Sequence, residues 1–110
     1  MDLVTKTVGK HLIFDLKDKT LDMQKAQLLK KEIFKILEED ESESIVFDMT
    51  HLTGIDSSGF ALIAQLNKKL QLENKSFYLI NVSAPVLGLI RMASMDSFLK
   101  ILPNEDSLPS

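Results

Sequence analysis

The 110-residue sequence contains no cysteine and no tryptophan, and it has only four glycines, three prolines and two histidines. Without cysteine the chain can form neither a disulfide framework nor a thiol nucleophile, which favours a reducing, cytoplasmic setting. Two histidines far apart in the sequence are too few for a zinc site or a histidine-based nucleophile system. A nucleotide-binding phosphate loop is also excluded, because glycine is sparse and no Gly-Lys-Ser/Thr signature is present. We therefore expect the chain to hold no metal and no cofactor.

An excess of charge of either sign is missing as well. The 13 basic and 16 acidic side chains give a net charge of −3, and basic and aromatic residues are not interleaved as in nucleic-acid binders. No apolar run approaches the roughly 20 residues that span a bilayer, and we expect no signal peptide at the N-terminus. A hydrophobic share of 45% is ordinary for a globular protein. We expect one domain without a nucleic-acid or membrane partner.

Hydrophobic patterns predict strands and helices that alternate along the chain. Short apolar or alternating runs predict strands over residues 3–8, 11–16, 44–49, 76–82 and 97–102. Apolar residues at three- to four-residue spacing predict helices over residues 21–40, 61–70 and 86–92. The order β-β-α-β-α-β-α-(β) predicts an α/β fold with a mixed, mostly parallel sheet of four to five strands, packed by helices.

Three local features complete this prediction. Residues 103–110 are polar, acidic and bounded by prolines, so we expect a flexible tail after a domain that spans residues 1–102. His11 could be a ligand or a base, but no acidic or histidine partner lies at a useful spacing, which favours a partly exposed strand-end residue. The acidic run 38–41 is unfavourable at a helix C-terminus and predicts a solvated loop rather than a metal site.

The segment LTGIDSSGF at residues 52–60 joins a predicted strand to a predicted helix with no spare residues. Asp56 and the two serines that follow it are of the type that caps helices, because their side-chain oxygens accept the unpaired N–H groups of the first turn. Thr20 or Asp22 can cap the preceding helix in the same way. A helix N-terminus is also a favourable place for a phosphate.

The residues at this turn leave more than one function open. A hydrolase nucleophile elbow needs glycine two residues before and two residues after its serine, and neither Ser57 nor Ser58 has both. A kinase could reach a serine at an exposed turn, and phosphorylation would add roughly −1.5 to −2 charges at pH 7. The plainer alternative is that Asp56 and the serines only cap a helix. Phosphorylation and simple capping both remain open on the residues alone.

Residues 48–60, with the sequence DMTHLTGIDSSGF, closely resemble the signature of the anti-sigma factor antagonists, the small single-domain members of the STAS family. That signature is a strand ending in an acidic or amide residue, a short loop, an apolar residue and then Asp-Ser-Ser/Thr-Gly-apolar. Two weaker similarities flank it, Leu-Asp-x-x-x-Ala-x-x-Leu at residues 21–29 and Asn-Val-Ser-Ala-Pro-Val at residues 81–86. The resemblance covers about residues 4–102 and implies a STAS fold.

The resemblance implies a phosphorylation switch. In the family, an anti-sigma factor with serine-kinase activity holds a sigma factor inactive, and the unphosphorylated antagonist binds that kinase and frees the sigma factor. The kinase phosphorylates the serine that directly follows the aspartate, here Ser57, and the product dissociates. A metal-dependent serine phosphatase then restores the active form. ATP and metal therefore belong to the partners, and the chain itself is expected to be a monomer without enzymatic activity.

The resemblance also implies which residues meet the partner: Asp22, Asp56, Ser57, Ser58, Gly59 and Phe60. In this interpretation Asp56 shapes the acceptor loop, and Gly59 lets the helix start close to the partner. One departure is that the Gly-Glu which usually precedes the Leu-Asp pair is replaced here by the loop at residues 17–20. A second hypothesis, of a different class, is a STAS scaffold in a larger assembly whose turn is never phosphorylated.

Overall fold

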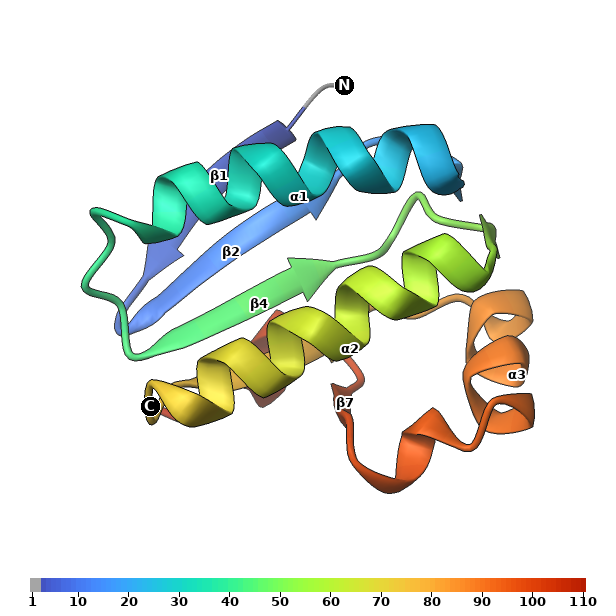
Figure 1. Cartoon of the computed structure of the whole chain (residues 1–110). Helices are drawn as coiled ribbons and strands as arrows, with labels where there is room; N and C mark the ends of the chain where they lie inside the picture. The colour runs from blue at the N-terminus through green and yellow to red at the C-terminus, as the bar shows by residue number, and fades with distance from the viewer. Residues whose placement is uncertain (1–2) are drawn as a thin grey trace.

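A five-stranded mixed sheet forms the centre of the computed structural model, which describes residues 3–110 (Figure 1). The strand order is β1-β2-β4-β6-β7, in which β1 and β2 are antiparallel and the other neighbours are parallel. The strands are β1 (Leu3–Val8), β2 (His11–Leu16), β4 (Ser44–Asp48), β6 (Ser76–Ile80) and β7 (Lys100–Leu102). The predicted α/β fold, with an opening hairpin and a mostly parallel sheet, is confirmed.

Two long helices, α1 (Met23–Leu37) and α2 (Ser57–Leu72), cover one face of the sheet, and α3 (Ala84–Met92) lies at its end (Figure 1). Side chains alternate along each strand, so every second residue points toward the helices. Phe47 in the central strand is fully buried and meets Phe14 and Phe77 edge-to-face at centroid distances of 6.0 and 5.1 Å. Such aromatic pairs stabilise a core by about 0.5–1.5 kcal/mol beyond the area they bury.

Some element boundaries differ from the sequence prediction. The strand predicted over residues 97–102 is shorter, because the 3₁₀ turn η1 (Met95–Ser97) precedes β7. Strand β6 ends at Ile80 because Asn81 adopts a left-handed backbone with φ of 55°. Two short strands were not predicted at all, namely β3 (Thr20–Leu21) and β5 (Gly54–Ile55), which form a separate parallel pair.

The C-terminal segment 103–110 packs on the sheet face opposite the helices, which differs from the expected free tail. It contains the 3₁₀ turn η2 (Glu105–Ser107), and Glu105 forms an ion pair with Lys6 of β1 at 2.6 Å. Leu108 packs against the buried apolar patch on this face, formed by Ile13, Val46 and Ile80. An apolar side chain, an ion pair and hydrogen bonds to the carbonyls of Pro103 and Pro109 therefore tie a segment of polar composition to the domain.

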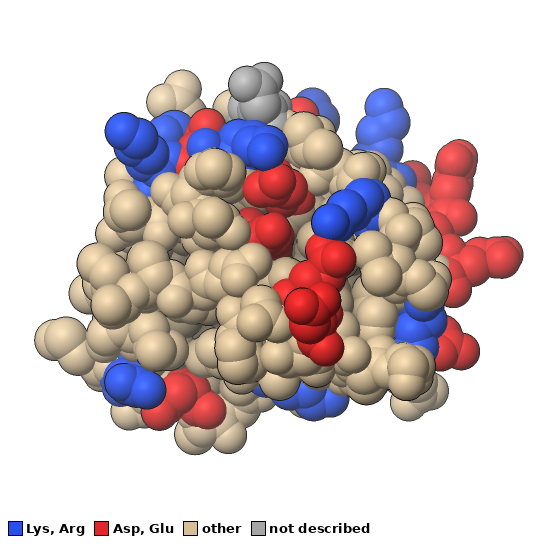
Figure 2. Space-filling model, turned by 180° about the vertical axis from the view of Figure 1, so that it is seen from behind, with Lys and Arg blue, Asp and Glu red and all other residues tan. Residues whose placement is uncertain are grey.

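His11 lies under the same segment and corrects a second expectation. Its ring is only 3% exposed rather than partly exposed, because Nδ1 is 2.7 Å from the Ser44 hydroxyl and Nε2 donates to the carbonyl of Pro109. The ring is therefore a structural group on the face away from the two long helices. Figure 2 shows this face, where acidic and basic side chains lie close together among uncharged residues.

Candidate functional site

The N-termini of α1 and α2 lie side by side at the carboxyl edge of the sheet, because β3 and β5 hold them together. Leu21 of β3 is paired with Ile55 of β5, and the amide of Asp56 donates to the carbonyl of Leu21 at 3.3 Å. Asp22 and Asp56 directly follow the paired residues and are the N-cap residues of α1 and α2. The structure thus brings together two segments that are 34 residues apart in the sequence.

Both cap aspartates are bound to their own helices. Oδ1 of Asp56 accepts hydrogen bonds from the amides of Ser58 at 2.9 Å and Gly59 at 3.1 Å. Oδ1 of Asp22 accepts one from the amide of Lys25 at 3.0 Å. Asp56 caps its helix as expected, and of the two residues expected to cap α1 it is Asp22 that does so. Replacing such a cap by alanine costs about 0.5–2 kcal/mol. Both carboxylates are exposed, so they also give this edge negative charge.

The two serines after Asp56 have different surroundings. Ser57 is the first residue of α2 and is exposed to solvent. Ser58 is half-buried and lines a groove of about 270 Å³ between α1 and α2. The other residues that line this groove are Met23, Ala26, Gln27, Lys30, Ala61, Leu62 and Gln65. Of the two hydroxyls, the one on Ser57 is the more accessible to an enzyme.

Gly59 faces the protein interior, so its missing side chain first serves packing within the domain. It is buried, and a Cβ atom built at this position would lie 2.8 Å from the carbonyl oxygen of Leu21 and 2.5 Å from Cγ1 of Ile55. The absent side chain therefore permits α2 to pack on β3 and β5. Phe60 is half-buried and packs against the core. Of the six predicted partner-binding residues, Asp22, Asp56 and Ser57 are exposed, Ser58 and Phe60 are half-buried, and Gly59 is inside.

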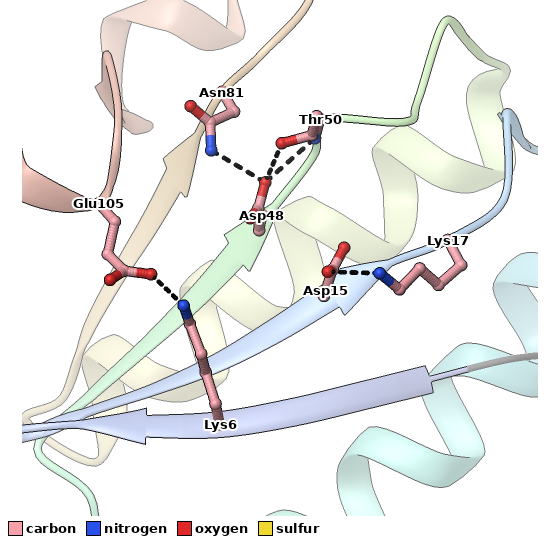
Figure 3. Close-up of polar contacts among 7 residues, drawn as sticks. All are labelled: Lys6, Asp15, Lys17, Asp48, Thr50, Asn81 and Glu105. Atoms are coloured by element: carbon pink, nitrogen blue, oxygen red, sulfur yellow. Dashed lines mark hydrogen bonds and ion pairs between the residues drawn. The ribbon is translucent and has the colours of Figure 1, made fainter.

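Asp48 is a further residue of this site that was not predicted as functional. It ends β4, and its Oδ1 accepts hydrogen bonds from the Thr50 hydroxyl at 2.6 Å, the Thr50 amide at 3.1 Å and the Asn81 side-chain amide at 3.0 Å (Figure 3). The sequence signal was an aspartate two residues before a threonine at a strand end, which is the pattern of an Asx turn. Asp48 therefore anchors the loop that leads to Ser57.

The hydrogen bonds at Asp48 also set its acidity. Partial burial by itself raises the pKa of this carboxyl, but the bonds from Thr50 and Asn81 together outweigh burial and hold the pKa below its ordinary value of 3.8. Because the pKa is lower in the folded chain, the charged carboxylate stabilises the fold above the unfolded pKa. That contribution is lost as the pH falls through the folded pKa.

We expect Asp48→Asn to be less stable than the wild type at neutral pH and to lose this disadvantage in acid. Asparagine keeps an acceptor oxygen but carries no charge, so protonation of residue 48 no longer affects unfolding. Urea unfolding from about pH 7 down to about pH 2 measures the difference in free energy of unfolding. A difference that stays constant over this range would contradict the assignment.

Comparison with known proteins identifies the family. The family model for the STAS domain matches residues 2–108, which is nearly the whole chain. The chain belongs to the STAS domain family. None of the curated proteins compared matches this STAS domain.

Solved structures with the same fold include anti-sigma factor antagonists. A candidate antagonist from Thermotoga maritima has a TM-score of 0.84 at 21% identity, over 94% of this chain and 88% of that one. The antagonist SpoIIAA of Bacillus has been solved in two forms. Its unphosphorylated form has a TM-score of 0.78 at 17% identity over 96% and 92% of the two chains, and its phosphorylated form has 0.71 at 16% over 96% and 96%.

The same fold also occurs within a much larger protein. The murine anion transporter Slc26a9 matches 92% of this STAS domain over 17% of its own length, with a TM-score of 0.76 at 13% identity. In this STAS domain, no helix among residues 3–110 has the length and apolar character needed to cross a membrane. The same described residues contain no cluster of three or more side chains suited to hold a metal ion.

Proposed function

We propose that this STAS domain is an anti-sigma factor antagonist that regulates sigma-factor-dependent transcription. It binds a serine-kinase anti-sigma factor while Ser57 is unmodified, and phosphorylation of Ser57 releases it. The observation that carries the proposal is the exposed hydroxyl of Ser57, held at the first position of α2 by the cap at Asp56. A metal-dependent serine phosphatase would restore the active form. We propose that the domain acts in this cycle as a cytoplasmic monomer without enzymatic activity of its own.

The charge at this edge explains how one phosphate could act as a switch. Phosphoserine carries roughly −1.5 to −2 charges at pH 7 and would lie beside the exposed carboxylates of Asp56 and Asp22. The positive end of the α2 dipole offsets part of this repulsion, by about 0.3–1 kcal/mol, so the domain itself stays folded. A docked partner that is acidic at this contact has no such compensation at its own surface, since like charges across an interface cost several kcal/mol. Binding is therefore the property that phosphorylation changes most.

Phosphorylation at Ser57 is tested directly by mass spectrometry. After incubation with the cognate kinase and ATP, we expect the wild type to gain a single phosphate and Ser57→Ala to gain none. Ser58→Ala is the matched control, because it removes the neighbouring half-buried hydroxyl and leaves the exposed one in place. A phosphate that persists in Ser57→Ala would refute the assigned acceptor.

A scaffold that is never phosphorylated is the second candidate function. The occurrence of the same fold within an anion transporter supports it, since there the domain is a small part of a larger protein. The segment at residues 17–20, which lacks the Gly-Glu usual among antagonists, includes the first residue of β3, Thr20, and lies just before the cap of α1 at Asp22. A scaffold predicts that changes at Ser57 leave partner binding unaltered.

A further inference from the structure

We propose that Asp48 and Asn81 form a polar clamp that positions the acceptor loop, residues 49–56, so that Ser57 can be phosphorylated. This inference rests on the proposed function and names positioning residues for it, since neither residue is adjacent to Ser57 in the chain. It goes beyond the six residues expected from the signature, because the clamp joins the end of β4 to the turn after β6 (Figure 3).

The hydrogen bonds of the clamp all end on one carboxylate oxygen. Three hydrogen bonds converge on Oδ1 of Asp48, two from Thr50 at the start of the loop and one from the Asn81 side chain. The bond of 2.6 Å from the Thr50 hydroxyl is short, as expected for a hydroxyl that donates to a carboxylate. Charge-assisted bonds of this kind are roughly twice as strong as bonds between neutral groups. Asp48 therefore fixes the direction in which the loop leaves the sheet.

The backbone conformation of Asn81 favours its side-chain contact with Asp48. Its backbone has φ of 55°, a left-handed conformation that asparagine adopts more easily than most residues other than glycine. The backbone N–H of Asn81 donates to the carbonyl of Pro103 at 3.2 Å, so a backbone hydrogen bond also holds this turn. The unusual conformation ends β6 and turns the side chain toward Asp48 (Figure 3).

The rest of the loop is held by backbone contacts. The Ser83 hydroxyl donates to the carbonyl of Leu52 at 2.9 Å in the middle of the loop, and the amides of Thr53 and Gly54 donate to the carbonyl of Lys19 at 2.7 and 3.1 Å. At the start of the loop two backbone bonds are present, from the Met49 amide to the Ile80 carbonyl at 3.0 Å and from the Leu52 amide to the Met49 carbonyl at 3.1 Å. The three bonds to Oδ1 of Asp48 add to these and are the part that one carboxylate supplies. Because a nucleophile that is displaced by a small distance loses much of its reactivity, release of the loop start should slow phosphoryl transfer to Ser57.

The neighbouring strand supplies a matched control. Asp15 of β2 is the register partner of Asp48, lies on the same face of the sheet and pairs with Lys17 at 2.8 Å (Figure 3). Lys17 lies in the chain directly after β2. The bonds from Thr53 and Gly54 to the nearby Lys19 use a backbone carbonyl, so they do not depend on the Asp15 side chain. Asp15→Ala therefore removes a carboxylate from the same face without touching the clamp.

Amide hydrogen exchange tests the clamp without any kinase. We expect exchange of the amides at residues 50–56, relative to those of β4, to rise about tenfold in Asp48→Ala when its three hydrogen bonds are lost. Asn81→Gly keeps the left-handed backbone and removes only the amide donor, so a smaller rise of about threefold is expected. Unchanged relative exchange in both variants, or an equal rise in Asp15→Ala, would overturn the clamp.

Phosphorylation kinetics then test its consequence. With the cognate kinase and ATP, we expect kcat/KM to fall about tenfold in Asp48→Ala, as for other misplaced reacting groups. Asp48→Asn, which keeps an acceptor at Oδ1, should restore kcat/KM to near the wild-type value, and Asp15→Ala should leave it unchanged. Equal rates in Asp48→Ala and Asp15→Ala would refute positioning. A wild type that is not phosphorylated would refute the proposed function, and the exchange experiment would still decide whether the clamp exists.

Discussion

Ser57→Asp should bind the kinase partner about 100-fold more weakly than Ser57→Ala, because a like charge at an interface costs several kcal/mol and each 1.4 kcal/mol is tenfold. The new carboxylate would lie at the exposed first position of α2, beside Asp56 and near Asp22. Alanine removes the hydroxyl but adds no charge, so it should bind like the unmodified protein. Isothermal titration calorimetry with the purified kinase, at a fixed low salt concentration, measures both dissociation constants.

A salt titration and a control variant with the same charge elsewhere separate this charge effect from a general loss of fold. Screening lengths shorten to about 3 Å at 1 M salt, so the difference between the two Ser57 variants should shrink as salt is added. Ser107→Asp places the same charge in η2, on the face of the sheet opposite the helices, and should bind like the wild type. Equal dissociation constants for Ser57→Ala and Ser57→Asp would favour the scaffold over the switch.

The main elements of this fold could be predicted from the sequence because their signals are local. Apolar residues recur every three to four positions in α1, and Ile45, Val46 and Phe47 form a continuous apolar run in β4, as expected for a strand in a parallel sheet. The cap at Asp56 was predictable for the same reason, since the residue acts on its own helix. Periodicity, however, needs several residues to be visible, and β3 and β5 have only two each.

The features that were missed depend on contacts between distant segments. Composition indicated a tail at residues 103–110, but Leu108 packs against the apolar patch on the back of the sheet. His11 has no partner nearby in the sequence, and its partners are residues 44 and 109. The signature contained Gly59 without indicating what it touches, because β3 is 38 residues earlier in the chain. Non-local packing of single side chains leaves no pattern in the sequence.

Gly59→Ala should destabilise the domain by about 1–3 kcal/mol, the usual cost of forcing extra atoms into a packed site. The new methyl would meet the carbonyl oxygen of Leu21 at 2.8 Å, and a backbone atom paired in a sheet cannot rotate away as a side chain can. The better helix propensity of alanine offsets up to about 1 kcal/mol of this cost, so the net effect remains a loss of stability. Thermal and urea unfolding, followed by circular dichroism, measure the change in the free energy of unfolding.

Gly88→Ala is the matched control for this prediction, and it should change stability in the opposite direction. Gly88 lies within α3, and a Cβ atom there would meet no heavy atom within 4 Å. We therefore expect a gain of up to about 1 kcal/mol from helix propensity alone. If Gly59→Ala also stabilised the domain, α2 would not rest on β3 as described, and the pairing that sets the two capped helix starts side by side would lose its support. A loss at Gly59 with a gain at Gly88 would instead show that the glycine of the signature is required for packing of the acceptor turn.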